Sequence, residues 1–290
     1  MTVRRNLWAA LSLLSMALGV AHAYAYKRTT TQSSNPPCPG NEAKPLAWRA
    51  TTLPYVIDGA GTPDVTGEAA FEAIQASFAA WQEVACPGAP ANGSGRSFLR
   101  FQYQGKQPDV PVGFNQSGNN VNVVKWFASG WTQSARAIAV TLTTYDCNSG
   151  EIFDADITLN GQNFSFSATG QAGRADLQNT VTHEVGHFIG FDHDLERAST
   201  MYADAPLGET SKRSLEPTDI EGACVVYAPD KAPCAATVIG RCASGSGGCS
   251  AAQALAPPGK SAAAGLIAGL AGLLLLAAAV TRRRARGRRG

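Results

Sequence analysis

The chain has 290 residues and a formal net charge of +2 at pH 7, but its charges are unevenly distributed. Nine of the 24 basic residues lie within the first five residues or after residue 259, whereas all 22 acidic residues lie between residues 24 and 249. The central part therefore has a net charge of −7, from 15 basic and 22 acidic residues. This acidic balance argues against nucleic acid or an anionic membrane surface as its partner.

The N-terminus has the features of a secretory signal peptide. Two arginines precede an apolar run over residues 7–20, and an A-x-A triplet ends at Ala23. This order predicts removal of residues 1–23 and a mature start near Tyr24. Residues 24–46 are polar and contain several prolines, so we expect an irregular lead or a short pro-segment there.

Strand and helix patterns alternate after this lead. Residues 48–57, 97–103, 121–127 and 137–144 have the composition of strands. Apolar residues at helical spacing predict a helix after the first strand, with Thr66 as its N-cap; they are Phe71, Ile74, Phe78, Trp81 and Ala85. The alternation predicts one α/β domain over residues 47–230, which is large enough for a single core.

The segment 150–160 alternates between apolar and polar side chains, which predicts a half-buried strand. One face would hold Phe153, Ala155, Ile157 and Leu159, and the other Asp154, Asp156, Thr158 and Asn160. The acidic face could bind calcium, which prefers carboxylate oxygens. A polar face in contact with solvent is the commoner explanation.

Three histidines then lie within eleven residues. The stretch 183–193 reads HEVGHFIGFDH, so His183, His187 and His193 follow the pattern H-E-x-x-H-x-x-G-x-x-H. Apolar residues at positions 177, 181, 185 and 188 predict a helix under its first part, with Asp176 as a candidate N-cap. Histidines four residues apart share one helix face, and Gly190 suits the break that returns His193 to them.

These residue types suit a catalytic zinc ion. Zinc prefers four tetrahedral ligands, and catalytic sites take three from the protein and leave the fourth position to water. A structural zinc site would need a fourth protein ligand, often a cysteine. We therefore expect one catalytic zinc on the three histidines, with Glu184 as the general base that takes a proton from the attacking water.

The same stretch carries a family resemblance. The motif is followed by Met201 within Ser199-Thr200-Met201-Tyr202, and residues 215–227 read LEPTDIEGACVVY. These features resemble the matrixins, which belong to the metzincin zinc endopeptidases. The resemblance implies a twisted, mostly parallel five-stranded sheet with about three helices, the last formed by residues 215–227. It also implies that Met201 is a hydrophobic floor beneath the zinc (the Met-turn) and does not ligate it.

The resemblance further implies how a substrate binds. Matrixins pair an extended peptide with an edge strand of the sheet, and residues 150–160 occupy the place of that strand in the sequence. Residues 203–214, which follow the Met-turn, should form a wall of the specificity pocket.

Three features depart from the matrixin pattern. Asp194 follows the third histidine, where vertebrate matrixins usually have serine, and in this respect the chain is similar to the adamalysins. No further histidines remain for a second, structural zinc, so we expect a single zinc ion. The segment around Cys38 lacks the arginine of the propeptide cysteine switch.

The seven cysteines predict disulfides in an exported chain. If Cys249 belongs to a sorting signal, six remain: Cys38, Cys86, Cys147, Cys224, Cys234 and Cys242. Six cysteines allow about fifteen pairings, and the sequence does not choose among them. Cys234 and Cys242 are close enough in the chain to form a local loop. The even number favours a bridged Cys38 over a free thiol that blocks the zinc.

The composition changes again near residue 230. Residues 231–260 are rich in alanine, glycine and serine, which predicts a flexible linker. Residues 261–281 contain no charge and are long enough to span a bilayer as a helix. Six arginines follow in residues 282–290, and by the positive-inside rule this tail stays in the cytoplasm while the α/β domain lies outside.

This ending resembles the myxobacterial C-terminal sorting domain, through the pair Gly248-Cys249, the hydrophobic span and the arginine-rich terminus. The resemblance implies recognition by a sorting protease and cleavage near Cys249. The protein would then be exported and either anchored at the cell surface or released outside the cell.

The leading hypothesis is a secreted, surface-tethered zinc endopeptidase that hydrolyses extended segments of extracellular proteins, and we expect a monomer. One alternative is a catalytically silent adhesion or binding module on the metzincin fold. Another is a zinc hydrolase of peptide crosslinks in the cell wall. Silent relatives typically lose the glutamate or a ligand, so the presence of Glu184 and all three histidines favours the enzyme.

Overall fold

A computed structural model describes residues 26–33, 37–87, 95–116, 118 and 120–228. Seven strands, three α-helices and one 3-10 helix follow one another in this part of the chain. In order they are β1 (Thr52–Asp58), α1 (Ala69–Gln82), β2 (Arg100–Gln107), β3 (Asn122–Trp126), β4 (Ala139–Tyr145), β5 (Ile152–Leu159), β6 (Phe166–Ser167), β7 (Ala175–Asp176), α2 (Leu177–Phe188), η1 (Ser211–Arg213) and α3 (Pro217–Val226). The expected α/β class is confirmed.

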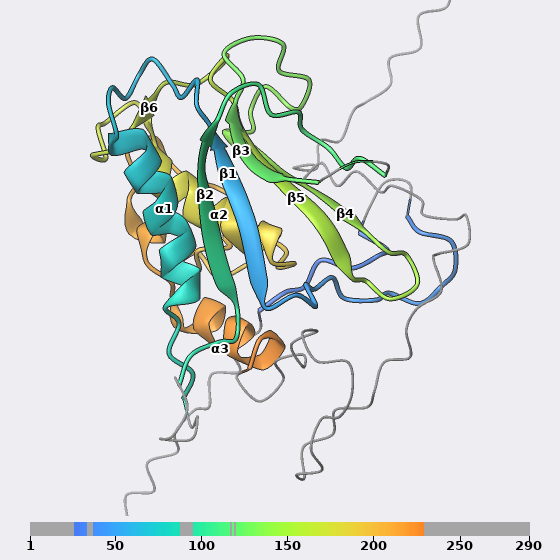
Figure 1. The fold of residues 1–290 in the computed structure, drawn as a ribbon. Helices are drawn as coiled ribbons and strands as arrows, with labels where there is room; N and C mark the ends of the chain where they lie inside the picture. Colours follow the sequence, from blue (N-terminus) through green and yellow to red (C-terminus); the bar gives the residue numbers. More distant parts are fainter. Residues whose placement is uncertain (1–25, 34–36, 88–94, 117, 119, 229–290) are drawn as a thin grey trace, which may run out of the picture.

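Five strands form the main sheet in the order β2-β1-β3-β5-β4. Four of them are parallel, and β4 pairs with β5 in the antiparallel direction (Figure 1). Because β4 is last in the strand order, it is an edge strand. The expected mostly parallel five-stranded sheet with three helices is therefore confirmed. The expectation that residues 150–160 form the edge strand is wrong, because β5 lies between β3 and β4.

The polar face of β5 is buried, contrary to the expectation of a face in contact with solvent. Asp154 and Asp156 are only 2% and 1% exposed. The carboxylate of Asp156 accepts hydrogen bonds from the backbone N–H groups of Gly113 (2.6 Å) and Val123 (2.9 Å). The chain before β3 thus folds over this side of the sheet, which a pattern of alternation cannot reveal.

The two longer helices, α1 and α2, pack against each other and against one face of the sheet (Figure 1). Their contact is rich in aromatic rings: Phe78 of α1 stacks on Tyr55 of β1 with 3.9 Å between ring centroids and meets Phe188 of α2 edge-on. α1 begins at Ala69, after Glu68, so the expected N-cap at Thr66 is wrong. The buried aromatic contacts hold α2, and with it the histidine motif, firmly on the sheet.

Two disulfides join distant parts of the chain, Cys38 to Cys147 and Cys86 to Cys224. The expectation that Cys38 is bridged is confirmed. The first disulfide fastens the N-terminal lead to the segment between β4 and β5, and the second fastens the end of α3 to the segment after α1. Each closes a loop of more than a hundred residues, with sequence separations of 109 and 138.

Several expectations lie outside the described residues. They are the signal peptide (1–23), the local loop of Cys234 and Cys242, the linker with Cys249, the membrane span (261–281) and the arginine-rich tail. Within the part of the chain that the structure describes, no helix is long and apolar enough to cross a membrane.

Candidate metal centre

The helix α2 presents the first two histidines on one face. Its N-cap is Asp176, as expected, and the Asp176 carboxylate accepts a hydrogen bond from the backbone N–H of Asn179 at 3.0 Å. The helix ends at Phe188, and Gly190 then adopts a φ of +91°. A Cβ at this position would also collide with the backbone carbonyl of Leu46. Glycine is thus required both for the turn and for the close approach of a neighbouring segment.

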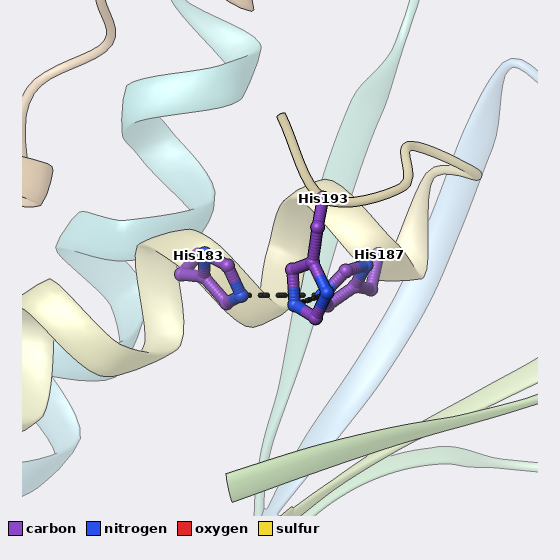
Figure 2. Close-up of side chains that lie close together, drawn as sticks. All are labelled: His183, His187 and His193. Carbon is purple, nitrogen blue, oxygen red and sulfur yellow. Dashed lines mark hydrogen bonds between the residues drawn. The ribbon is translucent and has the colours of Figure 1, made fainter. Parts of the chain in front are cut away.

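The turn brings His193 back over the helix face, so that the three imidazole rings converge (Figure 2). The Nε2 atom of His187 lies 3.2 Å from that of His183 and 3.1 Å from that of His193. Nitrogen ligands about 2.0–2.1 Å from a tetrahedral zinc lie roughly 3.3 Å from one another. Within the described residues, these three histidines form the one group of three or more His, Cys, Asp or Glu side chains close enough to share a metal ion.

The hydrogen bonds of the rings fix which nitrogens face the centre of the cluster. Nδ1 of His183 donates to the carbonyl of Thr200 (2.7 Å), and Nδ1 of His187 donates to the carbonyl of Phe191 (2.8 Å). A neutral imidazole that donates through Nδ1 has an unprotonated Nε2. Burial lowers the pKa of all three histidines, that of His187 to about 4, which keeps the rings neutral. Converging lone pairs repel one another unless a cation lies between them, so this donor set fits a zinc ion.

Glu184 is buried beside the cluster. Its carboxylate accepts a hydrogen bond of 2.6 Å from the hydroxyl of Thr141, in the edge strand β4. Burial raises the pKa of Glu184 to about 7, against the opposing effect of the Thr141 hydrogen bond. A carboxyl group with a pKa near neutrality is suited to both accept and return a proton. The contribution of Thr141 could not be read from the sequence, because it lies 43 residues from its partner.

Met201 lies buried under the motif helix, next to Gly186. The turn that contains it is held from α3: Asp219 accepts hydrogen bonds from the Ser199 hydroxyl (2.8 Å) and the Thr200 backbone N–H (2.9 Å). The carbonyl of Thr200 in turn orients His183. A carboxylate on the closing helix therefore positions a histidine of the cluster through the Met-turn, a role that sequence reasoning did not assign to Asp219.

The N-terminal lead supports the cluster from another side. The hydroxyl of Thr29 donates to the carbonyl of Phe191 at 3.0 Å, the same carbonyl that orients His187. The Thr29 backbone N–H bonds to the Gly190 carbonyl, and Lys27 pairs with Asp192 at 2.8 Å. The described residues of the lead thus lie along the segment between the second and third histidines, and none of them lines the pocket described next.

A pocket of about 540 Å³ opens beside His183 and Glu184. One wall comes from the segment before β4 and the start of that strand, and another from α2 at Asn179 and Thr180. As the resemblance implies, the segment after the Met-turn completes it, through residues 203–206 and Lys212. The pocket therefore adjoins both the edge strand and the candidate general base.

In a comparison with protein-family models, the matrixin model matches residues 47–228. This range contains the whole sheet, the histidine cluster and the closing helix. The chain belongs to the matrixin family. No curated protein matches it. The cluster of this matrixin and its family both indicate a zinc metalloprotease.

Calcium on the acidic face of β5, one of the two explanations that the sequence left open, is not shown. Asp154 and Asp156 belong to no group of three potential ligands in the described part of this matrixin. One buried oxygen of Asp154, Oδ1, has no hydrogen-bond partner there, whereas Asp156 bonds to backbone N–H groups. The resemblance of the C-terminal end to a sorting domain is likewise not confirmed, because the family match ends at residue 228.

Proposed function

We propose that this matrixin is a zinc-dependent endopeptidase that hydrolyses peptide bonds in extended segments of extracellular proteins. The observation that carries the proposal is the convergence of three histidine Nε2 atoms, two of them left unprotonated by the Nδ1 hydrogen bonds of their rings, beside the carboxylate of Glu184. The histidines would hold zinc, and the carboxylate remains free to handle protons. A silent binding module would not need that carboxylate.

The chemistry divides between the metal and the chain. Zinc, when bound, polarises the scissile carbonyl and lowers the pKa of water to about 7. Glu184 takes the proton as water attacks and passes it to the leaving amine, while Thr141 holds the carboxylate in place. Thr141 lies in β4, so an extended peptide that adds to the free edge of β4 passes directly beside Glu184.

The proposed location is the cell exterior, with the α/β domain tethered at the surface by residues 261–281 or released after cleavage near Cys249 by a sorting protease. Two disulfides in the described residues support an oxidising compartment. The rest of this proposal rests on the signal peptide and the arginine-rich tail that the sequence predicts. Expression with residues 261–290 present or removed, followed by fractionation of cells, measures whether this segment retains the protein.

The activity is tested by zinc content and casein cleavage in the exported protein and its Glu184→Gln variant. The variant should keep one zinc per chain and lose at least about a hundredfold in cleavage rate, the usual contribution of a general base. Glu221→Gln, at an exposed position of α3, is the matched control and should cleave like the wild type.

The outcomes separate the alternatives. Loss of zinc from Glu184→Gln would contradict the role assigned to the glutamate. Zinc binding without cleavage of any protein by the wild type would favour the binding module. Cleavage of cell-wall crosslinks but not of casein, measured in parallel, would favour the cell-wall hydrolase.

A further inference from the structure

The pocket beside Glu184 has polar residues on its inner wall. Asn179 and Thr180 of α2 and Lys212 of η1 line it, and all three are buried. Arg136 and Asp204 line the same pocket at exposed positions. Apolar residues at positions 137–139, 203, 205 and 206 form much of the remaining lining, so an aliphatic side chain can pack there. It would nevertheless displace water from the buried polar groups of the inner wall without replacing the hydrogen bonds.

Lys212 places a positive charge on this inner wall, since the residue is only 3% exposed. Its Nζ donates to the backbone carbonyls of Tyr202 and of Asp204, the latter at 2.9 Å. An ammonium group has three N–H donors, so one remains for a group bound in the pocket. Among the described residues, none of the ion pairs includes Lys212.

The carboxylates around Lys212 compensate its charge only from a distance. They are Asp204, Glu209, Glu184 and Asp219. The side chain of Asp204 is exposed, where solvent screens its field, and Asp219 already binds the Met-turn. The desolvation of Lys212 outweighs their attraction, since the net effect is a lowered pKa. A carboxylate that entered the pocket would therefore meet a buried cation whose hydrogen bonds, within the described residues, go to two backbone carbonyls and not to a carboxylate.

The edge strand indicates which substrate residue reaches this pocket. A peptide that adds antiparallel to β4 has its C-terminal half beside the start of that strand. Ala139, the first residue of β4, lines the pocket together with residues 136–138, whereas Thr141 contacts Glu184. With this antiparallel pairing, the residue directly after the scissile bond would lie next to the pocket.

We propose that the pocket accepts an acidic side chain, glutamate or aspartate, of the residue after the scissile bond, and that Lys212 determines this preference. The proposal rests on the endopeptidase function proposed above. Loss of a hydrogen bond to a charged group in a buried site reduces binding roughly 10- to 100-fold. The same factor is expected between peptides that carry glutamate and glutamine at this position.

The test compares kcat/KM for peptides that differ only in the residue directly after the scissile bond, which is glutamate, glutamine, leucine or lysine. Mass spectrometry of the products locates the bond that is cut. The wild type should favour glutamate over glutamine by about 10- to 100-fold. Lys212→Gln should reduce this ratio to near one, because the glutamine side chain is polar but carries no charge. Lys212→Arg, which keeps the charge, should keep the preference.

The results distinguish this proposal from the one on which it rests. Faster cleavage before leucine or glutamine than before glutamate by the wild type would overturn the acidic preference while leaving the endopeptidase intact. A zinc-loaded Lys212→Gln variant that retains the glutamate preference would overturn the role of Lys212. Failure to cleave any peptide would overturn the endopeptidase proposal, and the preference with it.

Discussion

Gly186, in the middle of the motif helix, is the position where helix propensity and packing predict opposite effects of one methyl group. In an exposed helix, replacing glycine with alanine stabilises by about 1 kcal/mol, because glycine loses more backbone entropy on folding. A Cβ at position 186, however, would lie 2.9 Å from Trp81 Cζ2 and would overlap the sulfur of Met201. Both side chains are buried, at 1% and 4% exposure.

Packing should outweigh propensity in Gly186→Ala. The Trp81 ring is held by a 2.8 Å hydrogen bond from Nε1 to the carbonyl of Thr182, so Met201 has to move. An extra methyl group in a packed core costs about 1–3 kcal/mol, which exceeds the gain of about 1 kcal/mol from propensity. We expect a net loss of about 1 kcal/mol in the free energy of unfolding, together with weaker zinc binding, because the Met-turn also orients His183.

Urea denaturation of the zinc-free proteins measures the first effect, and competition with a chelator measures the second. The control is the same substitution in a Met201→Ala background. There the methyl group enters the space that the sulfur vacates, so the part of its cost that comes from Met201 should disappear and appear as a coupling energy of about 1 kcal/mol or more, while the close contact with Trp81 remains. Gly186→Ala that is as stable as the wild type, or more stable, would refute the reasoning and show that Met201 moves without cost.

Three further predictions concern groups outside the histidine cluster. Burial raises the pKa of Asp154 from 3.8 to about 7, so the native state holds a proton that the unfolded chain releases, and stability should fall as pH rises from about 4 to about 7. Asp154→Asn should therefore be more stable than the wild type at pH 8 by about 2–4 kcal/mol, and the two should be equally stable at low pH. Equal stability in urea denaturation at pH 8 would contradict this. If added Ca²⁺ abolished the difference at pH 8, it would locate a calcium site at Asp154. Replacing Cys86 and Cys224 together by serine should lower the free energy of unfolding by about 2–5 kcal/mol, since the disulfide closes a loop with a sequence separation of 138; an unchanged urea midpoint would show that it contributes nothing. Thr29→Val should weaken zinc binding by up to about tenfold in chelator competition, because the Thr29 hydroxyl is bonded to the Phe191 carbonyl that orients His187. The control Thr30→Val, which removes a hydroxyl bonded to Ser33, should leave zinc affinity unchanged. Equal zinc affinities of the two variants would show that the N-terminal lead does not support the cluster.

Expectations that depend on short-range geometry agree with the structure. The repeat of a helix brings residues three and four positions apart onto one face, so the spacing of His183 and His187 predicts their convergence without knowledge of the fold. The cap at Asp176 and the turn at Gly190 are equally local, because each depends on one residue and its neighbours. The expected helix cap at Thr66 shows the limit of such reasoning, since residues of the same type also occur in loops.

Expectations that depend on which strands are neighbours in the sheet are partly wrong. Alternation along residues 150–160 correctly predicts a strand, but the pattern does not state what covers each face. The chain before β3 buries Asp156, and β4 occupies the edge that the family resemblance assigned to β5. The order of strands is set by which surfaces pack best over the whole domain, so it cannot be read from the alternation of one segment.

Eleven consecutive residues, 183–193, determine the kind of chemistry. Two zinc ligands and a general base on one helix, and a third ligand after a turn, need only the helical repeat and that turn. The partners of these residues come from elsewhere: Thr141 holds Glu184, Asp219 holds the Met-turn, and Lys212 charges the pocket. Thr141 lies 43 residues from Glu184, Asp219 lies 20 residues from Ser199, and Lys212 lies 33 residues from Asn179, to which its backbone N–H is hydrogen-bonded. Such contacts form when the buried surfaces of separate elements pack together, and that packing is a property of the folded domain rather than of any one segment.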